Sequence, residues 1–95
     1  MKGSTVPISQ LLNLGPKSEE WLNDVGIHSR VDLEQVGAVQ AFILLKDKGH
    51  KPSLNMLYAM AGALTDVRWN RLSGEKKAKL LLELDALEDF RSQMR

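Results

Sequence analysis

The chain lacks cysteine altogether, and this absence excludes two ways of stabilising a small domain. Neither a disulfide framework nor a cysteine-based zinc site can form, so an apolar core must hold the fold together. The 95 residues are enough for one domain with such a core. Because nothing in the fold depends on an oxidising compartment, we expect a cytoplasmic location.

Long apolar runs are also missing. The longest lies around residues 54–64 and is about half as long as a membrane-spanning helix. The N-terminal residues MKGSTVPIS hold no apolar stretch of the kind that a secretory signal requires. We therefore expect neither a signal peptide nor insertion into a membrane.

Motifs that carry out chemistry are absent as well. The sequence has no glycine-rich phosphate loop and no G-x-S-x-G nucleophile motif. Its only histidines, His28 and His50, have neither a paired nucleophile nor the spacing of a zinc signature. We expect no enzyme, no cofactor, no metal and no small-molecule substrate.

Charge is nearly balanced over the whole chain but unevenly distributed along it. The formal net charge of +1 is far from that of a dedicated nucleic-acid binder. Residues 1–45 carry three basic and five acidic side chains, and residues 80–95 carry two and four. Residues 46–79 carry eight basic side chains against three acidic ones. Any surface that seeks phosphate is therefore expected on the middle third of the chain.

Every apolar spacing in the sequence is helical, and none is a sustained strand alternation. The fold class is therefore all-α, a compact bundle of five to six helices with a helix-hairpin-helix-like element. Residues 1–7 are expected to be an N-terminal tail, and residues 8–95 a single domain. Capping residues and glycines predict six helices, over about residues 7–15, 16–26, 29–37, 38–47, 53–64 and 74–90. The last of them is expected to reach residue 90 or beyond.

The tight connection at Gly15 and Pro16 is the most informative local feature. Glycine can take a positive φ, and proline has its φ already fixed for a first helical position. Residues 11–37 therefore read as short helices joined by tight turns, an arrangement that binds either nucleic acid or another protein.

Apolar positions also predict the core. The helix over residues 54–64 is apolar nearly all round and is expected to be the central one, with Met56 and Met60 as core filler. Trp69 and Leu72 are expected to fold onto this core. In the last helix Leu80, Leu84 and Leu87 share one face, Leu81 and Phe90 broaden it, and Leu82 lies outside it.

Five motifs in order resemble those of a known family. They are LGPKS at residues 14–18, VGI followed by DL within residues 25–33, GAV at 37–39, SLN…LYA…GAL at 53–64 and W-N-x-L at 69–72. Over about Ile8 to Leu82 the sequence resembles the C-terminal domain of the TfoX/Sxy family of competence regulators. The resemblance implies a compact all-α domain related to helix-hairpin-helix and SAM-like folds. It further implies a role in regulating natural transformation genes, no catalytic activity and, in most members, an additional N-terminal domain.

Two interpretations of the binding function remain open. In the first, the domain contacts a regulatory protein or a second copy of itself through Leu82, Phe90, Trp21 and Trp69. In the second, it binds DNA phosphates through Asn13, Gly15, Lys17, Ser18, Lys46, Lys48, Lys51, Arg68, Arg71, Lys76, Lys77 and Lys79. Three departures from the DNA-binding hairpin favour the first. Asn13 replaces a glycine, Glu19 replaces a small alanine and is followed by Glu20 next to the expected phosphate site, and only one hairpin with little positive charge is visible.

Overall fold

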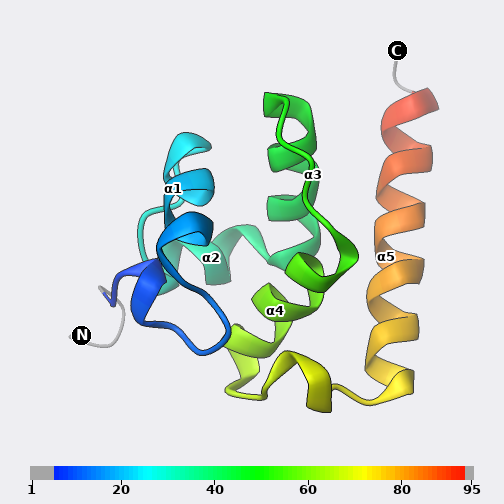
Figure 1. Ribbon diagram of the computed structural model, residues 1–95. Helices are drawn as coiled ribbons and strands as arrows, with labels where there is room; N and C mark the ends of the chain where they lie inside the picture. The colour runs from blue at the N-terminus through cyan, green and yellow to red at the C-terminus, as the bar shows by residue number, and fades with distance from the viewer. Residues whose placement is uncertain (1–5, 94–95) are drawn as a thin grey trace.

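The computed structural model describes residues 6–93 and confirms an all-α domain (Figure 1). The α-helices are α1 (Pro16–Asp24), α2 (Arg30–Val36), α3 (Ala38–Lys48), α4 (Leu54–Thr65) and α5 (Gly74–Gln93), and the 3-10 helices are η2 (Ile8–Gln10) and η3 (Trp69–Arg71). The predicted starts and ends of α1 to α5 agree closely with these bounds. Within the described residues there is no sheet, only an isolated bridge between Pro7 and Ser29.

The centre of the domain is α3, not α4 as the sequence predicted. Helix α3 contacts α1, α2, α4 and α5, and it buries six side chains: Ala38, Val39, Ala41, Phe42, Ile43 and Leu45. Its apolar band is wide because these residues fall on more than one face of the helix. Met60 of α4 is fully buried, as expected, whereas Met56 is only partly buried against the core.

The segment before Gly15 differs from the prediction. The expected helix over residues 7–15 is a single 3-10 turn, because Leu11 already adopts an extended conformation and Asn13 a left-handed one with φ 74°. Gly15 itself is extended, so the positive φ expected there lies two residues earlier. The helix-hairpin-helix-like element is not confirmed, since only one turn of 3-10 helix precedes α1.

The start of the described chain is fixed to α2. The carbonyl oxygen of Val6 accepts a hydrogen bond of 2.9 Å from the backbone N–H of Arg30, next to the bridge between Pro7 and Ser29. Ile8 follows and is fully buried. Two residues of the expected tail therefore lie against the domain.

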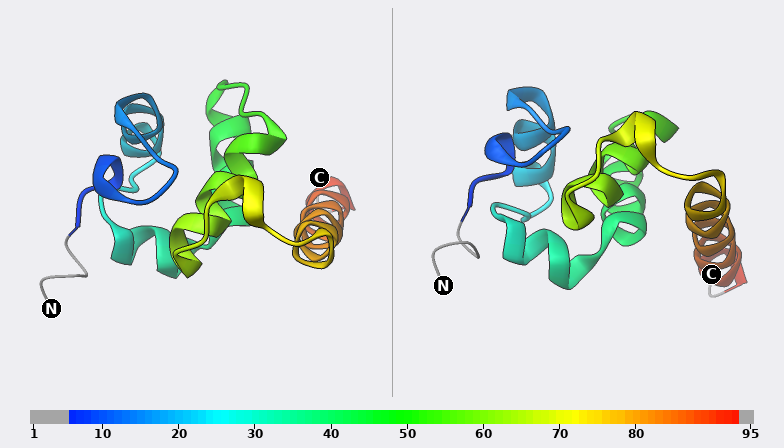
Figure 2. Two further views of the ribbon diagram at one scale, coloured as in Figure 1. Left: turned by 60° about the horizontal axis from the view of Figure 1, so that its bottom comes forward. Right: turned by 90° about the horizontal axis from the view of Figure 1, so that it is seen from below.

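Helix α5 lies at the edge of the molecule and packs mainly on α3 (Figure 2). Leu84 is buried, and Leu80 and Leu87 are partly buried against the core, as predicted. Two exposed ion pairs join the helices, Lys46 to Glu88 at 2.6 Å and Arg91 to Asp47 at 2.5 Å.

Two residues of α5 are more exposed than the sequence predicted. Leu81 and Phe90 do not broaden the buried face, since 38% and 59% of their surface remains exposed. The reason is that α5 meets the bundle along one narrow side, which the stripe of Leu80, Leu84 and Leu87 already fills. Leu82 is 71% exposed and lies outside this face, as expected.

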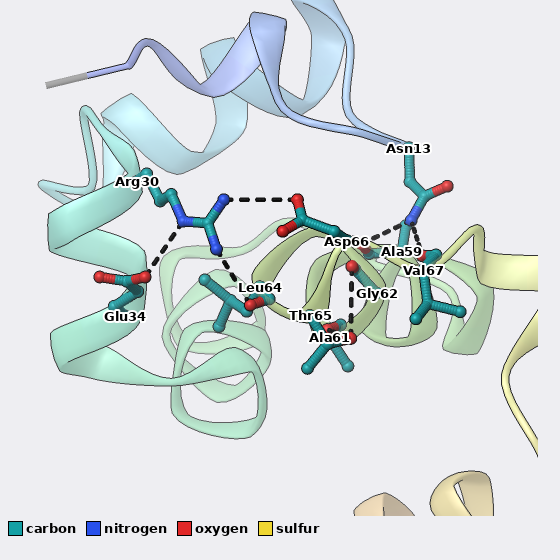
Figure 3. Close-up of polar contacts among 10 residues, drawn as sticks. All are labelled: Asn13, Arg30, Glu34, Ala59, Ala61, Gly62, Leu64, Thr65, Asp66 and Val67. Carbon is teal, nitrogen blue, oxygen red and sulfur yellow. Dashed lines mark hydrogen bonds and ion pairs between the residues drawn. The ribbon is translucent and has the colours of Figure 1, made fainter. Parts of the chain in front are cut away.

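The C-terminal end of α4 is clasped to the N-terminal loop (Figure 3). The Nδ2 group of Asn13 donates to the carbonyl oxygens of Val67 at 2.9 Å and Ala59 at 3.3 Å, while its Oδ1 accepts from the backbone N–H of Trp69 at 3.1 Å. Gly62 lies beneath: a Cβ atom there would be 2.2 Å from the Val67 oxygen and 2.7 Å from Asn13 Nδ2. We call this arrangement the Asn13 clasp.

A second polar cluster, centred on Arg30, connects α2 to the C-terminal end of α4 (Figure 3). Its guanidinium donates to Glu34 at 3.0 Å and to the Leu64 carbonyl oxygen at 3.1 Å, and it lies 3.5 Å from Asp66. The hydrogen bond to Glu34 is the main reason that the pKa of Arg30 is raised above its ordinary value. The side chain thus satisfies a carbonyl that the end of α4 leaves without a helical partner.

Replacing Gly62 tests the close approach inside the clasp. Gly62→Ala is expected to lower the free energy of unfolding by about 2 to 3 kcal/mol, because the new methyl group meets a backbone carbonyl that cannot move aside cheaply. Urea denaturation measures the change. Gly74→Ala is the matched control, since a Cβ at Gly74 meets no atom within 4 Å. Equal stability of the two variants would contradict the model of the clasp.

Replacing Asn13 separates its side chain from its backbone. Asn13→Gly keeps the left-handed conformation accessible but removes the side-chain bonds, and we expect a loss of about 2 kcal/mol in unfolding free energy. Asn13→Ala is expected to lose about 1 kcal/mol more, because alanine is strained at positive φ. Chemical denaturation of both variants gives the two values. If the glycine variant is as stable as the original chain, the side-chain hydrogen bonds of Asn13 do not contribute to the free energy of unfolding.

Candidate binding groove

An apolar groove lies between α1 and α4 on the described surface, with a volume of about 340 Å³. Both helices pack on α3 and make few contacts with each other, which leaves the space open. Helix α1 contributes Lys17, Ser18 and Trp21, helix α4 contributes Asn55, Met56 and Ala59, and Asn13 and Trp69 complete the lining. Residues four apart on each helix, such as 17 and 21 or 55 and 59, share the face that lines it.

Two tryptophans are the largest side chains of the groove. Trp21 is partly buried, while Trp69 is 41% exposed. The sequence predicted that Trp69 folds onto the core, and this prediction was wrong. The Asn13 clasp explains this position, because it holds the backbone N–H of Trp69 at the N-terminal loop and so fixes η3 beside α1. Leu72, three residues later, is buried as expected.

Trp21 is held in place from its outer side. Its ring stacks on the imidazole of His50, with 4.7 Å between ring centroids and 23° between planes. His50 Nε2 lies 2.9 Å from an Asp24 carboxylate oxygen, and Lys48 lies 3.9 Å from the other oxygen. The His50 ring therefore connects Trp21 to a charged group at the end of α1, and this packing restricts the tryptophan to one orientation.

The rim of the groove is basic at one point. The ammonium group of Lys17 lies 5.4 Å from the centroid of the Trp21 ring, a distance typical of a cation–π contact. Lys17 and Ser18 lie in the first turn of α1, as the sequence predicted, and Gly15 is its N-cap residue. Glu19, which the sequence placed beside this turn, accepts a hydrogen bond from the backbone N–H of Ser9 at 3.1 Å.

The predicted DNA-contacting residues fall into three groups. Asn13, Gly15, Lys17 and Ser18 lie in the loop before α1 and in its first turn. Lys46, Lys48 and Lys51 lie at the end of α3 and in the loop after it, whereas Arg68, Arg71, Lys76, Lys77 and Lys79 lie beyond the opposite end of α4 (Figure 1). Several are already engaged: Lys46 pairs with Glu88, and the Lys77 ammonium lies 5.1 Å from the Tyr58 ring centroid. Asn13 uses its side-chain amide in the clasp.

The predicted protein-interface residues also separate into two groups. Trp21 and Trp69 meet at the groove, whereas Leu82 and Phe90 lie on α5. The groove therefore brings together residues from the two predicted sets. Asn13, Lys17 and Ser18 were predicted to contact DNA, and Trp21 and Trp69 to contact a protein. Asn55, Met56 and Ala59 were not predicted as site residues, because their only sequence signal is a helical spacing that equally suits a core. His50 was not predicted either, because a single histidine in a lysine-rich loop gives no sign of what it contacts.

Two structural findings concern other kinds of site. Between residues 6 and 93, no three histidine, aspartate or glutamate side chains gather closely enough to hold a metal ion. Over the same stretch, no helix has both the length and the apolarity needed to cross a bilayer.

Two solved structures that are similar to this chain come from Listeria monocytogenes. An uncharacterized protein in a triclinic crystal form is 32% identical, covers 87% of this chain and 94% of its own, and superposes with a TM-score of 0.77. A protein of unknown function in a tetragonal form is 33% identical, with a TM-score of 0.74, and covers 83% of this chain and 98% of its own. No curated protein matches the sequence.

The family comparison covers most of the domain. The model of the TfoX C-terminal domain matches residues 5–84, a span that includes η2, α1 to α4, η3 and the first half of α5. It contains all eight residues that line the groove. The chain belongs to the TfoX C-terminal domain family.

Proposed function

We propose that the chain is a non-catalytic regulatory module that binds a segment of another protein in the groove between α1 and α4. The observation that supports this most strongly is the pair of tryptophans, Trp21 and Trp69, at an apolar groove on the surface. Membership of the TfoX C-terminal domain family suggests that the regulated process is natural competence.

Aromatic residues in a partly exposed groove are typical of protein interfaces. Tryptophan dominates binding energies at such interfaces because it removes a large apolar surface from water with little loss of side-chain freedom. Met56 lies between the helices and offers a flexible apolar surface that adapts to different partners. A groove of about 340 Å³ is large enough for one or two apolar side chains of a partner helix.

The rim adds a preference for charge. Lys17 lies at the edge of the groove, and Arg68 and Arg71 are exposed on either side of Trp69 in the chain. A partner segment that presents carboxylates next to its apolar anchor would therefore associate faster and in a defined register.

Site-specific crosslinking tests the proposal. A photo-crosslinking phenylalanine derivative in place of Asn55, exposed at the groove, is expected to give a defined covalent adduct with a regulatory protein in the host cell. Mass spectrometry identifies the adduct. The same derivative in place of Gln35, exposed on α2, is the matched control and should give none of it.

The additional substitution Trp69→Glu is expected to abolish the Asn55 adduct, because it places a charge in the apolar groove. An adduct that forms equally from both positions, or that survives this substitution, would rule out the groove as the binding site.

DNA binding is the second candidate, and exposed Arg68, Arg71, Lys76 and Lys79 favour it. We rank it lower because the basic residues of the middle third lie in two groups at opposite ends of α4. Phosphate contacts accumulate affinity only where several cations face one duplex, and Lys46 is already paired with Glu88.

A mobility-shift titration tests this second candidate. If DNA is bound, the combined change of Lys76, Lys77 and Lys79 to Ala should weaken binding to all sequences alike, and affinity should fall steeply with added salt. Lys46→Ala is the control and should change affinity less. Absence of any complex at micromolar protein in low salt would reject DNA binding.

A further inference from the structure

The large apolar side chains that the described surface leaves exposed form two sets. Leu54, the first residue of α4, is 45% exposed, and Trp69 of η3, which lines the groove, is 41% exposed. Leu81, Leu82 and Phe90 form the other set, on α5. A large exposed apolar patch marks a surface that binds a partner. Two such patches on one chain can be binding surfaces for each other in two copies of that chain.

The outward side of α5 has the pattern of a helix that docks into a groove. Leu82, Ala86 and Phe90 follow one another at intervals of four residues and therefore form a single stripe. Glu83 and Asp89 are exposed beside this stripe. Asp89 accepts a hydrogen bond from Gln93 within the helix at 3.4 Å, and both carboxylates remain open to solvent.

The charges on α5 are divided between its two sides. Glu88 and Arg91 face α3 and are paired with Lys46 and Asp47, so they hold the helix in place. The carboxylates of Glu83 and Asp89 border the exposed stripe instead. The stripe therefore has one carboxylate on either side, Glu83 and Asp89, and Lys79 is exposed one turn before it, whereas the groove is an apolar hollow with Lys17 on its rim.

We propose that the exposed stripe of α5 in one copy of this chain docks in the groove of a second copy, with Phe90 between Trp21 and Trp69 and the neighbouring Asp89 toward Lys17. This inference rests on the groove assigned under the proposed function and names one occupant for it. It makes the interface heterologous, with a different surface contributed by each copy.

Charge excludes the two symmetric alternatives. If the stripes of two copies packed against each other, Glu83 and Asp89 of one copy would face the same carboxylates of the other. If the two grooves packed against each other, the two Lys17 side chains would face each other. Like charges placed opposite each other at an interface weaken it, whereas stripe against groove brings opposite charges together. Because a heterologous contact leaves a free stripe and a free groove, assembly grows with concentration unless it closes into a ring.

A mixing experiment tests this inference on the full chain. Sedimentation velocity should show concentration-dependent association of the original chain. Phe90→Glu removes the stripe and Trp69→Glu removes the groove, and each variant alone is expected to associate at least thirtyfold more weakly. Mixed in equal amounts they should form a 1:1 dimer that does not grow, because one intact stripe and one intact groove remain.

Three further variants keep the test independent of folding. Gln35→Glu makes the same charge change on α2 and should leave association unaffected, and circular dichroism should show equal helix content in all variants. Lys17→Glu alone should weaken association about fivefold, and combining it with Glu83→Lys and Asp89→Lys should restore it.

Three outcomes would overturn the inference. They are a chain that stays monomeric at millimolar concentration, variants that fail to complement each other, and a loss on Phe90→Glu without a loss on Trp69→Glu. None of them affects the crosslinking test at Asn55. An adduct with another protein there, together with a monomeric chain, would retain the proposed function and reject self-association.

Discussion

The close approach of three chain segments at Gly62 is the constraint on which the rest of the structure depends. The Val67 carbonyl and the Asn13 side-chain amide both occupy the space that a Cβ atom at Gly62 would fill. Because Asn13 also accepts from the Trp69 N–H, the same contact sets the direction in which the chain leaves α4. The contact therefore helps to fix the position of Trp69 relative to the loop that precedes α1.

That constraint links the fold to the groove. Helix α3 supplies the apolar centre, and α1 and α4 both pack on it without closing on each other. The Asn13 clasp then places Trp69 at one end of the space between them, while the stack of His50 on Trp21 fixes the opposing ring. Packing of the core and positioning of the groove are therefore two results of the same few contacts. The residues that line the groove thus lie directly against residues that hold the fold together.

How much of the candidate site the sequence could predict depends on the residue. Lys17 was identified because it follows a proline at a helix start, where an ammonium group and free N–H groups can meet a phosphate, and Trp21 because it lies beside the apolar face of the same helix. Met56 was assigned to the core, since methionine at helical spacing reads the same whether the facing helix touches it or stands apart. Trp69 was expected to be buried, because an aromatic residue in a polar connector gives no sign of what lies opposite. Asn13 was interpreted as a substitute for glycine, and its left-handed φ of 74° agrees with that, but its three hydrogen bonds could not be foreseen.

By itself, the sequence determined the helical class, the ends of α1 to α5 and most of the core, because caps, glycines and apolar periodicity are local signals that act over about four residues. The family likewise followed from motifs that can be seen along the chain. The tertiary structure alone decided which helix is central, which apolar residues stay exposed and where the charges gather. Those properties depend on contacts between residues such as Asn13 and Val67, 54 positions apart, and no local pattern encodes a distance of that kind.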